Sequence, residues 1–190
     1  NLTEDEHYVL IASGVVDPAA FDGTEPSGFS LEVFAGAKTH ADQASNVELN
    51  IHHGSPDAPA VDIYTIQTGD SPAVTDLAYP AFTGYTALSP DNEVVGIAGA
   101  GGQVLAEFSA PLADLNTAGA AMTVLASGFF DAANASQGNA FGLLAVLPDG
   151  TALMLEAVEP DPGTAQLQII HNSPDPAVDT VDIFVNGEAF

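Results

Sequence analysis

The sequence predicts an all-β fold made of antiparallel β-sandwich repeats in tandem, of an Ig-like or Greek-key type. Three observations lead to this fold class. Apolar and polar residues alternate with a period of two in several short segments, turn-forming residues separate these segments, and blocks of sequence recur at a domain-sized distance. With 190 residues, 46% of them hydrophobic, the chain has enough apolar material to bury a core.

Each predicted strand carries its apolar residues on one face. Within residues 47–53, Val47, Leu49 and Ile51 share a face with His53, while the residues between them are polar or charged. The same alternation is present in residues 7–11, 104–108, 167–171 and 181–185. No segment combines a 3.6-residue apolar period with helix caps, so the sequence predicts no amphipathic helix.

Turn-forming residues separate the strands at short intervals. Pro-Asp-Gly at 148–150 joins two apolar segments, and so does the glycine-rich segment 99–102, so each predicts a hairpin. Asn-Gly at 186–187 follows another predicted strand and suits a two-residue type I′ turn. Many short strands with such turns between them are typical of a β-sandwich.

Three blocks of the sequence occur twice, in the same order. The pairs are 9–17 with 123–131, 29–31 with 141–143, and 47–64 with 165–184. The third pair is the clearest, because both copies contain His-x-Ser-Pro-Asp followed by Val-Asp-Ile or a close variant. The distance between copies is roughly 115 residues, which is the size of a domain and not of a solenoid unit.

These matches predict three parts of an array. Residues 47–162 form a complete repeat, residues 1–46 are the C-terminal part of a preceding repeat, and residues 163–190 are the N-terminal part of a following one. The expected partners are therefore adjacent repeats of the same chain or further copies of the protein, joined head to tail through strand pairing.

The chain is strongly acidic. It has 26 acidic residues and a single base, Lys38, which gives a net charge of -25 at pH 7. This imbalance argues against binding to nucleic acid or to anionic membranes, because both require Lys and Arg to neutralise phosphate. No apolar run is long enough for membrane insertion, and the absence of cysteine excludes disulfides and thiolate metal sites.

The repeated motif resembles a known family. The segment IHHGSPDAPAVDIY at 51–64, followed by LAYPAFTGYTAL at 77–88 and MTVLASG at 122–128, is similar to the DUF4397 family, whose members carry a motif close to HASPDAPAVDVYVNG. The resemblance implies a secreted or surface-exposed β-sandwich module, often in tandem. It brings no catalytic residues, since the family's function is not established.

The motif itself is the first candidate site. Its residues are His53, Ser55, Pro56, Asp57 and Asp62, and in the second copy His171, Ser173, Pro174, Asp175 and Asp182. A hydrolase would need the serine, histidine and aspartate in line, which residues two and four apart in a turn rarely achieve. We expect instead a structural turn, with a buried His53 bonded to the following turn and with Ser55 and Asp57 bonded to backbone amides.

Other candidate sites are weaker. Asp17, Asp22 and Glu25 could supply oxygen ligands for calcium, although their spacing is not that of an EF-hand. Several aromatic residues could form a sugar platform, but a sandwich of this size needs most of them in its core. Asn134 begins an Asn-Ala-Ser glycosylation pattern.

The sequence therefore favours a non-enzymatic protein at the cell surface or outside the cell. We expect a structural or adhesive module of a long surface protein or filament, with no cofactor other than a possible Ca²⁺. The alternative is an extracellular module that binds glycans or calcium through loops at one end of the sandwich.

Overall fold

The computed structural model describes residues 2–21, 28–65, 68–69, 71–99, 101–135 and 138–158, together with the backbone of 184–185 and 188–189. The chain divides into two units, residues 1–160 and residues 161–190. In the second unit, strands β13 (Phe184–Val185) and β14 (Glu188–Ala189) pair antiparallel, with Val185 opposite Glu188. This pairing is that of the hairpin predicted around 186–187.

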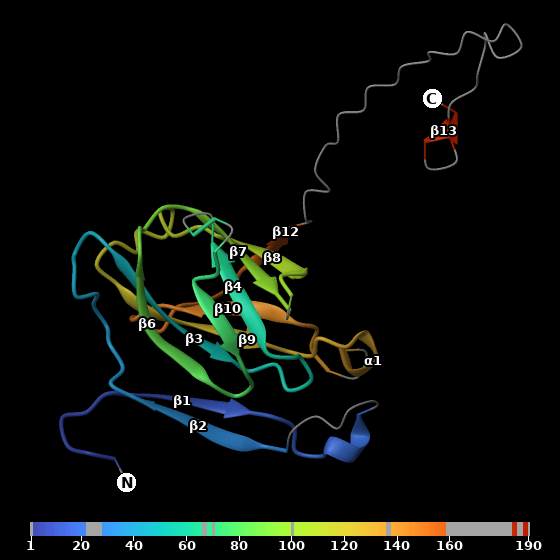
Figure 1. Cartoon of the computed structure of the whole chain (residues 1–190). Coiled ribbons are helices and arrows are strands. Elements are labelled where there is room, and N and C mark those ends of the chain that lie inside the picture. Colours follow the sequence, from blue (N-terminus) through green and yellow to red (C-terminus); the bar gives the residue numbers. More distant parts are fainter. Residues whose placement is uncertain are drawn as a thin grey trace, which may run out of the picture. The chain divides into compact units, whose positions relative to one another are not determined.

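Two five-stranded sheets form the body of the first unit (Figure 1). The first sheet has the order β11-β10-β9-β3-β6. Its strands are β3 (Val47–His53), β6 (Phe82–Leu88), β9 (Ala121–Ser127), β10 (Gly142–Val146) and β11 (Ala152–Met154). The turn at 148–150 connects β10 to β11, as predicted, because Val146 lies opposite Ala152.

The second sheet has the order β12-β8-β7-β4-β5. Its strands are β4 (Val61–Thr65), β5 (Val74–Leu77), β7 (Glu93–Ala98), β8 (Val104–Ala110) and β12 (Glu156–Val158). The glycine-rich segment after residue 98 connects β7 to β8, with Ala98 opposite Val104. The chain passes from the first sheet to the second at Leu155, which is buried between β11 and β12.

The all-β prediction is confirmed, with one difference in strand direction. All strand pairs in the two sheets are antiparallel except β3 with β9, which run parallel with His53 opposite Ala126. These two strands are far apart in the sequence, so no hairpin constrains their direction, and a long crossover permits parallel pairing. Antiparallel pairing throughout was predicted because the turn residues in the sequence indicate local hairpins.

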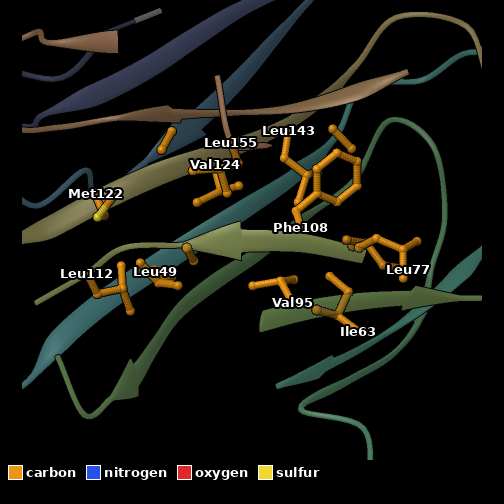
Figure 2. Packing of buried hydrophobic residues seen from close by; sticks show 14 of the residues in the cluster. Leu49, Ile63, Leu77, Val95, Phe108, Leu112, Met122, Val124, Leu143 and Leu155 are labelled. Carbon is orange, nitrogen blue, oxygen red and sulfur yellow. The ribbon is translucent and has the colours of Figure 1, made fainter. Parts of the chain in front are cut away.

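Both sheets contribute to one hydrophobic core. Val47 and Leu49 of β3, with Val124 and Leu143 of the neighbouring strands, belong to the same buried cluster as Phe108 of the second sheet. Figure 2 shows the side chains of Leu49, Val124, Leu143 and Phe108 between the strands, together with those of Ile63 and Val95. The face of β3 that the alternation assigned to the core is therefore the core face.

A separate hairpin packs on the other face of the first sheet. It consists of β1 (Tyr8–Ser13), a short 3-10 helix, η1 (Pro18–Ala20), and β2 (Ser30–Ala35). The ring of Phe34 lies 5.3 Å from that of Phe82 and 5.9 Å from that of Tyr85, both on β6. As a result the polar face of β3, with Glu48, Asn50 and His52, is buried as well.

The hairpin has the same register as β9–β10. Ala12 pairs with Leu31, and their sequence equivalents Ala126 and Leu143 pair in the same way. An isolated parallel bridge joins Val15 to Gly28, and its equivalent joins Phe129 to Ala140. Helix η1 begins at Pro18, and α1 (Ala132–Ala135) begins at the equivalent position. The similarity of 9–17 to 123–131 thus extends to the strand pairing.

Candidate functional site

The Ser-Pro-Asp turn follows the end of β3 and lies against the loop that follows β9. His53 and Ala126 are already neighbours in the parallel ladder. The next residue, Gly54, donates its amide to the Ala126 carbonyl at 2.8 Å. A Cβ at residue 54 would lie 2.7 Å from that carbonyl oxygen, so only glycine allows this approach of two backbones.

Ser55 bonds to the same loop. Its side chain is buried, and its hydroxyl donates to the Gly128 carbonyl at 2.8 Å and to Asp57 Oδ1 at 3.4 Å. The hydroxyl is therefore a structural donor that holds the loop after β9 against the turn after β3.

Asp57 makes the most bonds in the motif. Its carboxylate accepts from the Phe130 amide at 2.8 Å, the Asp131 amide at 3.1 Å and the Asn134 side chain at 3.0 Å. Partial burial raises the pKa of this carboxyl, but the bonds from Asn134, Phe130 and Asp131 outweigh it and leave the pKa below its usual value. The group is therefore ionised at neutral pH and joins the two loops.

His53 is buried and bonded within its own loop. Its Nε2 lies 3.0 Å from the Pro59 carbonyl, which can only accept, so Nε2 carries the proton. The other ring nitrogen has no hydrogen-bond partner. Since the Ser55 hydroxyl donates to a carbonyl, serine and histidine do not form a nucleophile–base pair in this arrangement.

Several predicted site residues lie elsewhere. Asp62 is on β4, where its carboxylate accepts from the Asp76 amide at 2.9 Å, so it is not part of the turn.

The second copy of the motif, from His171 to Asp182, lies outside the described residues, as do Asp22 and Glu25. Asp17 accepts from the Ala19 amide and caps η1. Within the described part of the chain, no three His, Asp or Glu residues are placed to hold a metal ion together.

The partners of the motif were missed by sequence reasoning. Gly128 and Asn134 lie 73 and 77 residues from the side chains that they contact. The signal for Gly128 was the recurrence of Ala-Ser-Gly at the same distance before an aspartate, at 12–17 and 126–131. Asn134 fits a glycosylation pattern, but its side chain is buried and bonded to Asp57, which leaves it inaccessible in the folded domain.

Lys38 forms ion pairs with two carboxylates, one of them on β3 of the first sheet. Its ammonium is 2.9 Å from Glu48 Oε2 and 3.0 Å from Asp42 Oδ2. Hydrogen bonds to Glu48 and Asp42 raise the pKa of Lys38. The single base of the sequence thus compensates the buried carboxylate of Glu48 on β3.

Two cavities accompany these features. One of about 40 Å³ lies between the two sheets and is lined by apolar side chains and His53. Another of about 290 Å³ lies between β1 and the first sheet, lined by Ile11, Lys38, Tyr85 and Leu125 among others.

Phe108 and Phe129 are buried, so they do not belong to a surface platform for sugars.

His52 is expected to make the domain sensitive to mild acid. Its ring is buried beneath the β1–β2 hairpin, with Nε2 3.1 Å from Ser13 Oγ. Burial is the main cause that lowers the pKa of His52. The unfolded chain therefore takes up a proton near pH 6.5 that the folded domain resists, and stability is lost as pH falls below about 6.5.

The test is urea unfolding of the wild type and of His52→Gln, followed by circular dichroism at pH 7 and pH 5. We expect the wild type to lose stability relative to the variant at pH 5. Because acid also reduces the net negative charge of both proteins equally, only the difference between them reports on His52. Parallel pH profiles would contradict the prediction.

The geometry defines an all-β domain in which a Ser-Pro-Asp turn fastens two loops at one end of paired sheets. The family model described as "Domain of unknown function (DUF4397)" matches residues 47–184. The chain belongs to this family, which confirms the resemblance carried by the motif. No curated relative and no solved structure matches the chain. None of the helices in the described part is long and apolar enough to span a bilayer.

Proposed function

We propose that this protein is a structural or adhesive β-sandwich module of a long extracellular surface protein or filament, in which such repeats follow one another. The observation that carries the proposal is the equivalence of two hairpins. The residue pairs of β1–β2 are equivalent in sequence to those of β9–β10, an equivalent parallel bridge follows each first strand, and a short helix begins at the equivalent position. This recurrence of one hairpin supports a chain that is built from repeats.

The arrangement of the sheets supports the sandwich. Two five-stranded sheets contribute side chains to a common buried cluster, as the facing sheets of Ig-like and Greek-key sandwiches do. The polar groups of the motif are used in loop-to-loop bonds, which stiffen one end of the domain. Rigidity of this kind suits a load-bearing or spacing element.

The cellular location is tested directly on the cells that produce the protein. Antibodies raised against the 190-residue chain should label the outside of intact cells in immunogold microscopy. They should also recognise, in immunoblots, a chain considerably longer than this one, which protease treatment of intact cells removes. Labelling confined to the cell interior would overturn the proposal.

Salt is expected to stabilise the domain. With 26 acidic residues and one base, the folded state suffers self-repulsion that ions screen. The melting temperature should rise as NaCl increases from low to high concentration, and a flat or falling melting temperature would contradict this. CaCl₂ at matched ionic strength is the control, since an additional rise with Ca²⁺ would favour the calcium-binding alternative.

A further inference from the structure

The β1–β2 hairpin exposes an apolar face. Leu10 is 50% exposed, Leu31 55% and Val33 50%, and Ala12 between them is also exposed. The opposite face of the hairpin is the one that packs on the first sheet, through Ser13 and Phe34. The exposed residues therefore form one contiguous patch on two paired strands.

The equivalent face of β9–β10 is buried. Leu10 and Val33 pair with each other, as do their equivalents Val124 and Ala145. Val124 is 7% exposed and Ala145 2%. Likewise Leu31 is 55% exposed, whereas its equivalent, Leu143, is 2% exposed.

A specific partner covers that face in the complete repeat. Val124, Leu143 and Ala145 belong to a single buried cluster with Ile63 of β4, Val95 of β7 and Phe108 of β8. Within the complete repeat, the second sheet therefore covers this face of the β9–β10 hairpin.

The loop of the hairpin also keeps the form of its equivalent. Gly14 has φ 77° and Gly128 has φ 87°, and each is followed by a parallel bridge. In the complete repeat, the amides of Phe130 and Asp131 bind Asp57. Val16, the equivalent of Phe130, is 90% exposed.

We propose that the exposed face of the β1–β2 hairpin, formed by Leu10, Ala12, Leu31 and Val33, is a docking surface for a preceding repeat of the same polypeptide. That repeat covers the face with strands equivalent to β4, β7 and β8. The aspartate of its own Ser-Pro-Asp turn accepts from the amides of Val16 and Asp17. The β1–β2 hairpin then has one face in the core of the preceding repeat and the other face on the first sheet of the repeat that follows it. This inference rests on the tandem-repeat part of the proposed function and is independent of the cellular location.

The test extends the chain with its own sequence. A second copy of residues 47–120 is joined ahead of His7, the position equivalent to Ala121, and hydrogen exchange is measured by mass spectrometry and NMR. We expect the added segment to be protected and the amides of Val16 and Asp17 to exchange more slowly than in the unextended chain. An added segment that stays unprotected and protease-sensitive while residues 47–158 remain folded would overturn the proposal.

Two variants of the extended chain make the test specific. Leu31→Asp should unfold the added segment and leave the original repeat folded, whereas Val104→Asp in the original copy, which changes an exposed valine on β8, should not. Asp57→Asn in the added copy alone should remove the protection of Val16 and Asp17. Equal protection of the added segment with and without Leu31→Asp would overturn the proposal. A second outcome would also overturn it. If the unextended chain self-associates, if Leu31→Asp abolishes that association, and if the added segment of the extended chain stays unfolded, the exposed face is a dimer interface.

Discussion

Replacement of Asp57 by alanine is expected to destabilise the domain by about 3 kcal/mol. The substitution removes the acceptor for two backbone amides and the Asn134 side chain, and it leaves Asn134, which is buried, without its partner. Bonds to an ionised carboxylate are stronger than neutral ones, which is why the loss exceeds that of an ordinary hydrogen bond. Because the chain has no tryptophan, unfolding in urea is best followed by circular dichroism.

Asp62→Ala is the matched control for this prediction. Asp62 belongs to the same motif, but among the residues that the structure describes it accepts one amide, that of Asp76, so its loss should cost only about 1 kcal/mol. Equal effects of the two substitutions would show that Asp57 has no special role.

The pH dependence of Asp57 gives a second measurement. Its pKa is lowered in the folded domain, so its contribution is present above the ordinary aspartate value of about 3.9 and is lost as pH falls through the folded value. The stability difference between the wild type and Asp57→Asn should therefore shrink below about pH 4. A difference that stays constant down to pH 2 would contradict the role of the charge.

Local features of the fold could be predicted from the sequence. The turns at 148–150 and 99–102 were found because proline, glycine and aspartate favour tight turns whatever the rest of the fold. The core face of β3 was found because alternation with a period of two assigns residues to faces without reference to the neighbouring strands.

Non-local features could not be predicted. The parallel pairing of β3 with β9 joins strands about 70 residues apart, and neither strand carries a local signal for its partner. His52 lies on the polar face of β3, and its burial depends on the β1–β2 hairpin, which the sequence analysis assigned to a different repeat. The chain's passage between sheets at Leu155 has no turn signal either, because only one residue separates β11 from β12.

The candidate site illustrates the same division. The residues of the Ser-Pro-Asp turn could be chosen from sequence because they recur as one compact block. Their partners could not be assigned, because a backbone carbonyl or amide, such as those of Gly128 and Phe130, leaves no side-chain signature. The recurrence of Ala-Ser-Gly marks the loop, and only the folded chain relates the two blocks to each other.

Gly128→Ala is expected to be the most damaging single substitution in this loop, with a loss of about 4 kcal/mol or more. Gly128 has φ 87°, which is unfavourable for alanine. A Cβ at this position would also lie 2.2 Å from the Ala140 carbonyl oxygen and 2.6 Å from its carbon. Ala140 cannot move aside freely, because its neighbours Asn139 and Phe141 are both bonded to the backbone of Phe129.

Gly150→Ala separates the two causes of this loss. Gly150 has φ 86°, nearly that of Gly128, but no atom lies within 4 Å of the added Cβ. Its substitution should lower the free energy of unfolding only by the cost of a left-handed backbone conformation at alanine, about 1–2 kcal/mol. We therefore expect Gly128→Ala to lower the urea midpoint much further than Gly150→Ala, or to abolish folding where Gly150→Ala does not. Equal midpoints would mean that the loop after β9 relaxes around the methyl group, and that its close contact with residues 139–140 does not stabilise the domain.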